Sequence, residues 1–417
     1  MPSPPAPAKL ADMKQSQPNE TRLNRRQPLP PSRDSSRGPS GQAGRGPGRA
    51  RAAGQPDEPG YRCKVKVGSA DGILAVVPHL LGFHPTKSLV VLGIGGPHAR
   101  IRLAFRYDLP DPADVSLSED IAAHAVNVLG REHLTMAILV GYGTGPAVTP
   151  VIDVIGSALR DAQVAIQDAL RVDEGRYWSY RCSDPACCSP DGVPYDASAH
   201  PAAVALEAAG LSVHADRNEL ASTLARIPES AEPMTSAIER ARARANHMIE
   251  QAMIVGPEGD LFQPVADAGR KSIRQVVTGY RRGDQLASYD EMAWLAFVLT
   301  DMRVRDDAWA RMDPQYSEAH QLLWTTLLRV LPTEFVPAPA ALLAFVSWQA
   351  GDGALATIAI ERALDADPDY TMALLIADAL HAGLPPSAAR LSMTPKQVAA
   401  SYAKHRRPPT RSNRRRD

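Results

Sequence analysis

The sequence predicts an α/β layered sandwich followed by an all-α array of helices. Between residues 61 and 200, apolar runs with strand character alternate with helical periodicity, which is typical of a sheet with helices on its faces. From residue 201 to 390 the strand pattern disappears and alanine-rich helical patterns take over. Two segments rich in Pro, Arg and Ser, at 1–60 and 391–417, flank this body. We therefore expect two structured domains between two tails.

The composition is that of a globular chain with an aliphatic core. Of 417 residues, 44% are hydrophobic, 22% are charged and 5% are aromatic. No apolar run reaches the roughly 18 residues of a membrane helix, and the N-terminus lacks the apolar stretch of a secretory signal. Four cysteines are too few for a disulfide framework in a chain of this length. We therefore expect a cytoplasmic protein with no membrane partner.

Both ends of the chain are basic, and they balance an acidic body, since the formal net charge is zero. A segment of this composition buries too little apolar surface to offset its ordering entropy, so we expect residues 1–60 to be disordered. We expect 391–417 to be a basic tail with a short helical turn over 394–404. Arginine-rich tails can contact the phosphates of a nucleic acid, but these tails are almost free of aromatic side chains for base stacking. Nucleic-acid association is therefore the weakest functional alternative.

Within the α/β part, local patterns predict a sheet that is mostly parallel with an antiparallel edge hairpin. Residues 88–94 form a continuous apolar run, which is typical of a strand buried on both faces. Residues 100–107 alternate apolar and polar side chains, which predicts a strand with one polar face. The turn sequence at 173–175 predicts a hairpin between strands at 163–172 and 176–181. Further strands are expected at 64–67 and 134–141, and helices at 71–81, 117–129 and 150–161.

Beyond residue 201, prolines and glycines divide the chain into helices. Asp216, followed three residues later by Glu219, forms a capping box that opens a helix to about 226. Pro228 ends that helix. The remaining helices are expected at 232–253, 265–281, 289–299, 306–312, 317–330, 340–349, 354–366 and 371–382.

Residues 337–370 match the 34-residue tetratricopeptide pattern in part. With Pro368 as the exit proline, Ala356 and Ala363 fall where the two helices of a unit cross closely. The match is incomplete, because Ala340 stands where the pattern usually has a tryptophan. Helix pairs of this kind usually bind other proteins, so the pattern favours a protein or peptide partner.

The most distinctive motif is the run Pro-His-Leu-Leu-Gly-Phe-His-Pro at 78–85, before Ser-Leu-Val-Val-Leu at 88–92. Together with the cysteines at 182–188 and the segment 348–356, it resembles a bacterial family known only as a domain of unknown function. The resemblance covers most of residues 64–386. It implies an α/β part followed by a helical part, and it brings neither an activity nor catalytic residues.

The first candidate ligand site lies around Gly68 and Ser69, where a predicted strand passes into a helix. Backbone N–H groups at a helix start can hold an anion, but the glycine spacing fits neither a P-loop nor a dinucleotide fingerprint. His79 and His84 flank the next turn, and histidine can serve as acid, base or ligand. The alternative is that both histidines have structural roles, because no nucleophile or carboxylate stands at a recognisable spacing.

The second candidate site is the Cys-x4-Cys-Cys motif of Cys182, Cys187 and Cys188. Metal sites usually combine Cys-x2-Cys pairs into four ligands, so His200 or Cys63 would have to complete this set. A redox pair between Cys182 and one of its neighbours, or simply reduced thiols, are the alternatives. The sequence specifies no cofactor.

No motif in the sequence identifies a reaction, so we favour a non-enzymatic interaction or regulatory protein with a helical protein-binding surface. The main alternative is an enzyme or small-ligand-binding protein with its site at the sheet edge around Ser69 and His84, which are its catalytic candidates.

Overall fold

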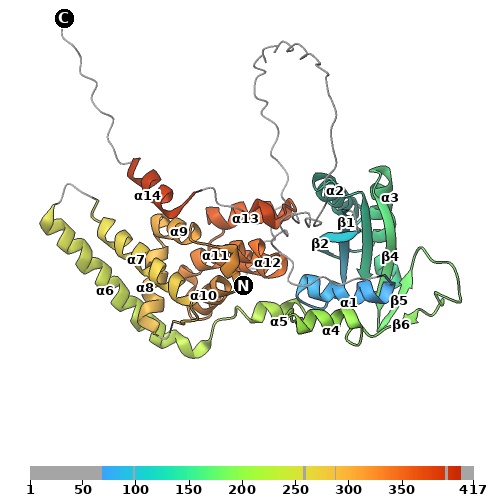
Figure 1. Cartoon of the computed structure of the whole chain (residues 1–417), viewed down its shortest axis with the longest axis horizontal. Coiled ribbons are helices and arrows are strands. Elements are labelled where there is room, and N and C mark those ends of the chain that lie inside the picture. Colours follow the sequence, from blue (N-terminus) through green and yellow to red (C-terminus); the bar gives the residue numbers. More distant parts are fainter. Residues whose placement is uncertain (1–67, 97–98, 257–259, 287, 390–392, 405–417) are drawn as a thin grey trace, which may run out of the picture. The chain divides into compact units, whose positions relative to one another are not determined.

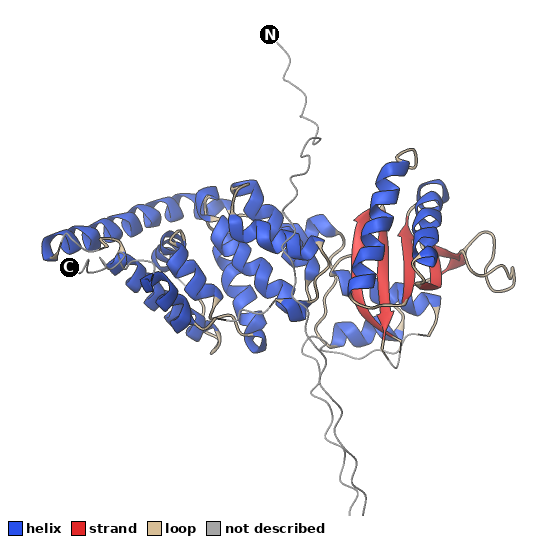
Figure 2. Cartoon of the chain, turned by 90° about the horizontal axis from the view of Figure 1, so that it is seen from above, coloured by secondary structure: helices blue, strands red, loops and turns tan. Residues whose placement is uncertain are grey.

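The computed structural model describes residues 68–96, 99–256, 260–286, 288–389 and 393–404 (Figure 1). The predicted strand at 64–67, the tail at 1–60, the last residues of the C-terminal tail and Cys63 lie outside these ranges. The described chain combines one sheet and its helices with a second, helical part, and Figure 2 shows the strands gathered into that sheet. Within the described residues, no helix has both the length and the apolar character needed to cross a bilayer.

The sheet has six strands in the order β2-β1-β3-β4-β5-β6. The hairpin predicted around 173–175 is confirmed, and its turn places Glu174 and Gly175 at positive φ. The strands are β1 (Ser88–Gly95), β2 (Arg100–Asp108), β3 (Met136–Tyr142), β4 (Ala165–Asp173), β5 (Arg176–Ser179) and β6 (Val193–Pro194).

The expectation of a mostly parallel sheet is wrong. Among the described strands, only β3 and β4 pair in parallel, and the other four pairings are antiparallel. The short link after β1 turns the chain straight back into β2, and β3 then runs antiparallel along the other edge of β1. A continuous apolar run reports that a strand is buried, but it carries no information on the direction of its neighbours.

Strand β1 is buried on both faces because its side chains alternate between two cores. Leu89 and Val91 belong to the core beneath α2 (Val115–Arg131) and α3 (Gly145–Asp161). Val90 and Leu92 belong to the opposite core, which includes side chains of α1 (Ala70–Leu81). Successive side chains of a strand point to opposite faces, so a central strand covered on both sides has no polar face.

The helical part confirms most of the predicted helices with small shifts at their ends. Two boundaries differ: the helix expected to reach 226 ends at Ser222, and the helix expected at 306–312 begins at Met302 because Asp301 caps it. The sequence also gave no separate signal for α4. The helices are α4 (Pro201–Ala208), α5 (Arg217–Ser222), α6 (Ala231–Val255), α7 (Gln263–Tyr280), α8 (Tyr289–Leu299), α9 (Met302–Trp309), α10 (Ser317–Leu328), α11 (Pro337–Gln349), α12 (Gly353–Ala366), α13 (Thr371–His381) and α14 (Pro395–Lys404).

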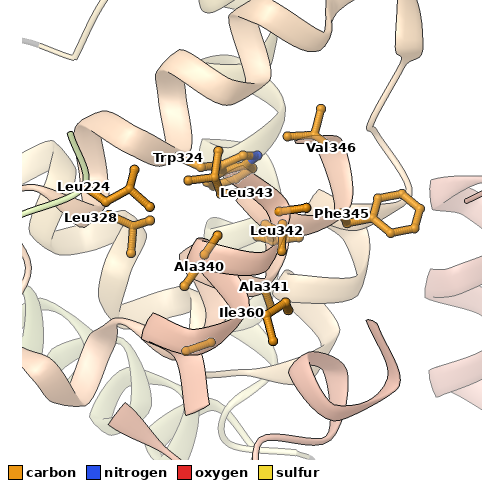
Figure 3. Packing of buried hydrophobic residues seen from close by; sticks show 14 of the residues in the cluster. Leu224, Trp324, Leu328, Ala340, Ala341, Leu342, Leu343, Phe345, Val346 and Ile360 are labelled. Atoms are coloured by element: carbon orange, nitrogen blue, oxygen red, sulfur yellow. The ribbon is translucent and has the colours of Figure 1, made fainter. Parts of the chain in front are cut away.

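Helix α11 is the centre of the helical part. Every residue from Pro337 to Trp348 is buried, and the helix packs against α10, α12 and α13. Figure 3 shows Leu342 and Leu343 of this helix near Trp324 of α10. A helix that is apolar on all sides is typical of the core of a bundle.

Helix α14 belongs to the packed structure, although the sequence suggested only a short turn in a tail. It packs on α9, and the Tyr402 hydroxyl donates a hydrogen bond of 2.5 Å to the Asp306 carboxylate. Burial, and then the hydrogen bond to Asp306, raises the pKa of Tyr402 to about 12.

Candidate functional site

The three cysteines of the sequence motif converge in the loop that joins β5 to β6. We call residues 180–192 the thiol loop. The sulfur atoms of Cys182, Cys187 and Cys188 all lie within 4.8 Å of one another, and those of Cys187 and Cys188 are 4.0 Å apart. All three cysteines are free thiols, and Cys187 is exposed while the other two are half-buried. The structure therefore groups residues that the sequence only placed near one another.

A tight turn at Asp184 brings the motif back on itself. The Asp184 carbonyl oxygen accepts hydrogen bonds from the backbone N–H groups of Cys187 at 3.1 Å and Cys188 at 2.7 Å. Its carboxylate accepts a further bond of 2.9 Å from the N–H of Ala186. Aspartate commonly forms such turns, because its short side chain reaches the backbone two residues ahead. The turn carries Cys187 and Cys188 back towards Cys182.

The far end of the thiol loop is held by Trp178 of β5. The Trp178 Nε1–H group donates a hydrogen bond of 2.9 Å to the carbonyl oxygen of Pro190. Gly192 follows with a φ of +81°, and a Cβ atom there would lie 2.6 Å from the Trp178 ring. Glycine is therefore required both by the backbone conformation and by the close approach of the ring.

Hydrogen bonds within the group favour one thiolate. The backbone N–H of Asp184 lowers the pKa of Cys182, and the neighbouring thiol of Cys188 adds to the effect. The same interaction with Cys182, followed by burial, raises the pKa of Cys188 to about 12. Since the thiolate is the nucleophile and the metal ligand, these shifts favour Cys182 over Cys188 in both roles.

The first candidate site has a different geometry. Gly68 and Ser69 are exposed immediately before α1, and the Ser69 side chain bonds to Asp71 and lowers the pKa of that carboxyl. His79 is buried on α1, with its Nδ1 atom 3.1 Å from the carbonyl oxygen of Ala75. His84 has an exposed side chain, so the two imidazoles lie in different environments.

His200, which the sequence offered as a possible fourth metal ligand, has other contacts. Its Nδ1 atom accepts a hydrogen bond of 3.1 Å from the N–H of Ala202 at the start of α4. Its Nε2 atom lies 4.0 Å from a carboxylate oxygen of Asp71. His200 therefore caps a helix and faces an acid, and it does not belong to the described thiol group.

An open surface pocket of about 370 Å³ lies between α7, residues 310–314 after α9 and the start of α14, and none of the sequence predictions includes it. Its lining includes Arg274, Arg281 and Arg311 together with one acid, Asp313. Arg311 is paired with Asp307, and Arg281 donates a hydrogen bond of 2.6 Å to the carbonyl oxygen of Arg311. Arg274 on α7 and Arg281, which caps the end of that helix, are seven residues apart, a spacing that places both on one face and could have signalled the pocket.

A comparison with family models finds a match over most of the chain. The model described as Domain of unknown function (DUF4192) matches residues 71–387, which include both the sheet and the helices up to α13. No curated protein and no solved structure matches the chain. The predicted resemblance to an uncharacterised family is thus confirmed, and the chain belongs to the family described as Domain of unknown function (DUF4192).

Proposed function

We propose that the protein is a non-enzymatic interaction or regulatory protein that binds a protein partner on its helical part. The observation that carries the proposal is the packing of α13 against both α11 and α12. The first helix of one tetratricopeptide unit stacks on the preceding helix pair in the same manner. Ala356 and Ala363 are fully buried, as close-crossing positions require, and Gly351 makes the turn between the paired helices at a φ of +82°.

The binding surface of this proposal is the outer face of α13. Leu374 and Leu375 are 41% and 60% exposed, whereas Met372, Ala373 and Ile376 are buried on the inner side. Single exposed leucines are ordinary on protein surfaces, but two in succession on a helix that already buries its inner face form a compact apolar anchor. A partner that covered them would remove apolar area from water, which is favourable by roughly 25 cal/mol per Å².

The charges around these leucines indicate what kind of partner fits. Asp378 is exposed and lies one helical turn after Leu374 and Leu375, so it shares their face. Asp365 and Asp369 are exposed at the end of α12 and in the loop before α13. We therefore assign to this surface a basic amphipathic helix of a partner protein, whose apolar side would meet the leucines and whose Lys or Arg residues would meet the acids.

The test compares affinity capture by the full-length chain and by two variants. The double variant Leu374→Glu, Leu375→Glu should lose the partner, because a carboxylate would then replace each apolar contact. Leu322→Glu is the matched control, since Leu322 is 48% exposed on α10. Circular dichroism should show both variants folded. Equal recovery of the same partner from the double variant and the wild type would exclude this surface.

Asp378→Lys gives a second, electrostatic arm of the test. It should weaken the same complex and reduce its dependence on salt, because exposed charge pairs are screened as ionic strength rises. A complex that survives this change with unaltered salt dependence would contradict the basic character of the partner.

A further inference from the structure

The separations within the thiol loop match those of ligands around one metal ion. A zinc–sulfur bond is about 2.3 Å long, so two thiolates on one tetrahedral ion lie roughly 3.8 Å apart. The sulfur atoms of Cys187 and Cys188 are 4.0 Å apart, and Cys182 completes a group whose members are all within 4.8 Å. Even the upper bound on the separations in this group exceeds the distance expected on one ion by only about 1 Å.

The ordinary roles of cysteine account poorly for this group. Buried cysteines usually act as small apolar side chains, but Cys187 is exposed and the other two are only half-buried. A disulfide requires sulfur atoms about 2.05 Å apart, and those of Cys187 and Cys188 lie 4.0 Å apart.

The backbone holds the three positions before any ligand arrives. The Asp184 turn fixes Cys187 and Cys188, and Trp178 anchors the end of the loop at Pro190. The backbone N–H of Asp184 bonds to the sulfur of Cys182, which is the kind of outer contact that orients a metal ligand. The site is therefore preorganised by groups that are not themselves ligands.

We propose that Cys182, Cys187 and Cys188 bind a single zinc ion, with water in the fourth coordination position. Thiolates favour soft or borderline ions, and zinc imposes no geometry that three thiols of one loop could not meet. An iron–sulfur cluster is a poorer fit, because such clusters usually take four cysteine ligands spread over two or more iron atoms, whereas this group has three. His200 is occupied at the start of α4, which leaves the fourth position to solvent. This proposal is independent of the partner surface on α13.

The experiment begins with the full-length protein, purified with added zinc and without any reducing agent that also chelates metals. Elemental analysis should find one zinc per chain in the wild type. Cys182→Ser, Cys187→Ser and Cys188→Ser should each weaken binding by more than about 100-fold, since even the loss of an outer contact typically costs 10- to 100-fold. Cys63→Ser is the matched control and should retain one zinc.

A cobalt titration of the chelator-treated wild type tests the site without any variant. Thiolate ligation should give a strong sulfur-to-cobalt charge-transfer band in the near ultraviolet, and visible bands of tetrahedral intensity should saturate at one cobalt per chain. Added zinc should displace the cobalt and abolish both signals.

Three results would overturn the proposal. One is a zinc content near zero together with a cobalt titration that shows no charge-transfer band. Another is a non-reduced protein two mass units lighter because Cys182 is joined to Cys187 or Cys188. The third is zinc that persists in all three loop variants but disappears in Cys63→Ser.

Discussion

The guanidinium of Arg171 lies 3.4 Å from the centroid of the Trp178 ring, and the two residues are direct partners in the β4–β5 ladder. An arginine over the face of a tryptophan is held by the electrostatic attraction between the cation and the ring. The ring in turn donates its N–H to Pro190. We call these contacts of Arg171, Trp178 and Pro190 the aromatic clamp, and they join the β4–β5 strand pair to the end of the thiol loop.

Replacement of Trp178 by Phe should destabilise the protein by about 1 kcal/mol. The phenyl ring keeps an aromatic face for Arg171 but cannot donate to the Pro190 carbonyl, and a typical hydrogen bond contributes about that amount. Urea denaturation measures the change. The companion variant Arg171→Lys keeps the charge and loses the planar stack, so it should also be less stable. A Trp178→Phe protein as stable as the wild type would show that the clamp does not stabilise the fold.

Gly192→Ala should cost more stability than Gly175→Ala, although both glycines have positive φ. At Gly175 the φ is +72° and an added Cβ meets nothing within 4 Å, so only backbone strain of about 1 kcal/mol applies. At Gly192 the φ is +81° and the Cβ would also meet the Trp178 ring at 2.6 Å. We expect a loss of at least about 2 kcal/mol there. Denaturation of the two variants side by side isolates the cost of the clash with the Trp178 ring. Equal losses of stability in the two variants would contradict such a clash.

Ala363→Leu should destabilise the helical part by about 1–3 kcal/mol, because Ala363 is fully buried between packed helices and extra methylene groups overpack such a site. Thr357 lies on the exposed face of the same helix, so Thr357→Leu should change stability by no more than about 0.5 kcal/mol. Thermal denaturation followed by circular dichroism compares the two. Similar small effects would mean that the α11–α12 crossing tolerates large side chains.

His320 should make folding stability depend on pH between about 4 and 6.5. Burial, and then the charge of Arg281, lower its pKa from 6.5 to about 4. In this window the unfolded chain binds the proton that the folded protein rejects, so stability rises with pH and is lost as pH falls. The contribution is at most about 3 kcal/mol.

The measurement for His320 is the free energy of unfolding at several pH values in that window. His320→Leu should flatten the pH dependence, whereas His247→Leu, at an exposed position of α6, should leave it unchanged. A slope that persists in His320→Leu would assign the effect to other groups.

Local signals predicted the elements that depend on few neighbours. The helix expected at 289–299 matches α8 at both ends, because Ser288 caps it and an apolar run follows. The hairpin at 173–175 is also present, because Gly175 accepts the positive φ that its turn requires. The prediction of a mostly parallel sheet is wrong, because the apolar run at 88–94 indicates only that its strand is buried. It carries no information on the direction of the strands beside it.

The candidate sites likewise depend partly on local sequence and partly on tertiary structure. The cysteine spacing marked Cys182, Cys187 and Cys188 as a group, but the turn at Asp184 and the anchor at Trp178 bring their sulfur atoms together. The arginine-lined pocket is formed by the end of α7, by residues 310–314 after α9 and by Pro395 at the start of α14, three segments that are far apart in the chain.

The sequence by itself determined which segments are buried, where most helices begin and end, and which family the chain resembles, because periodicity, capping and motifs are written in neighbouring residues. Only the tertiary structure decided the strand directions, the central place of α11 and the surroundings of His320. These depend on contacts between segments distant in the chain, and close packing selects such contacts from many arrangements that share the same local pattern.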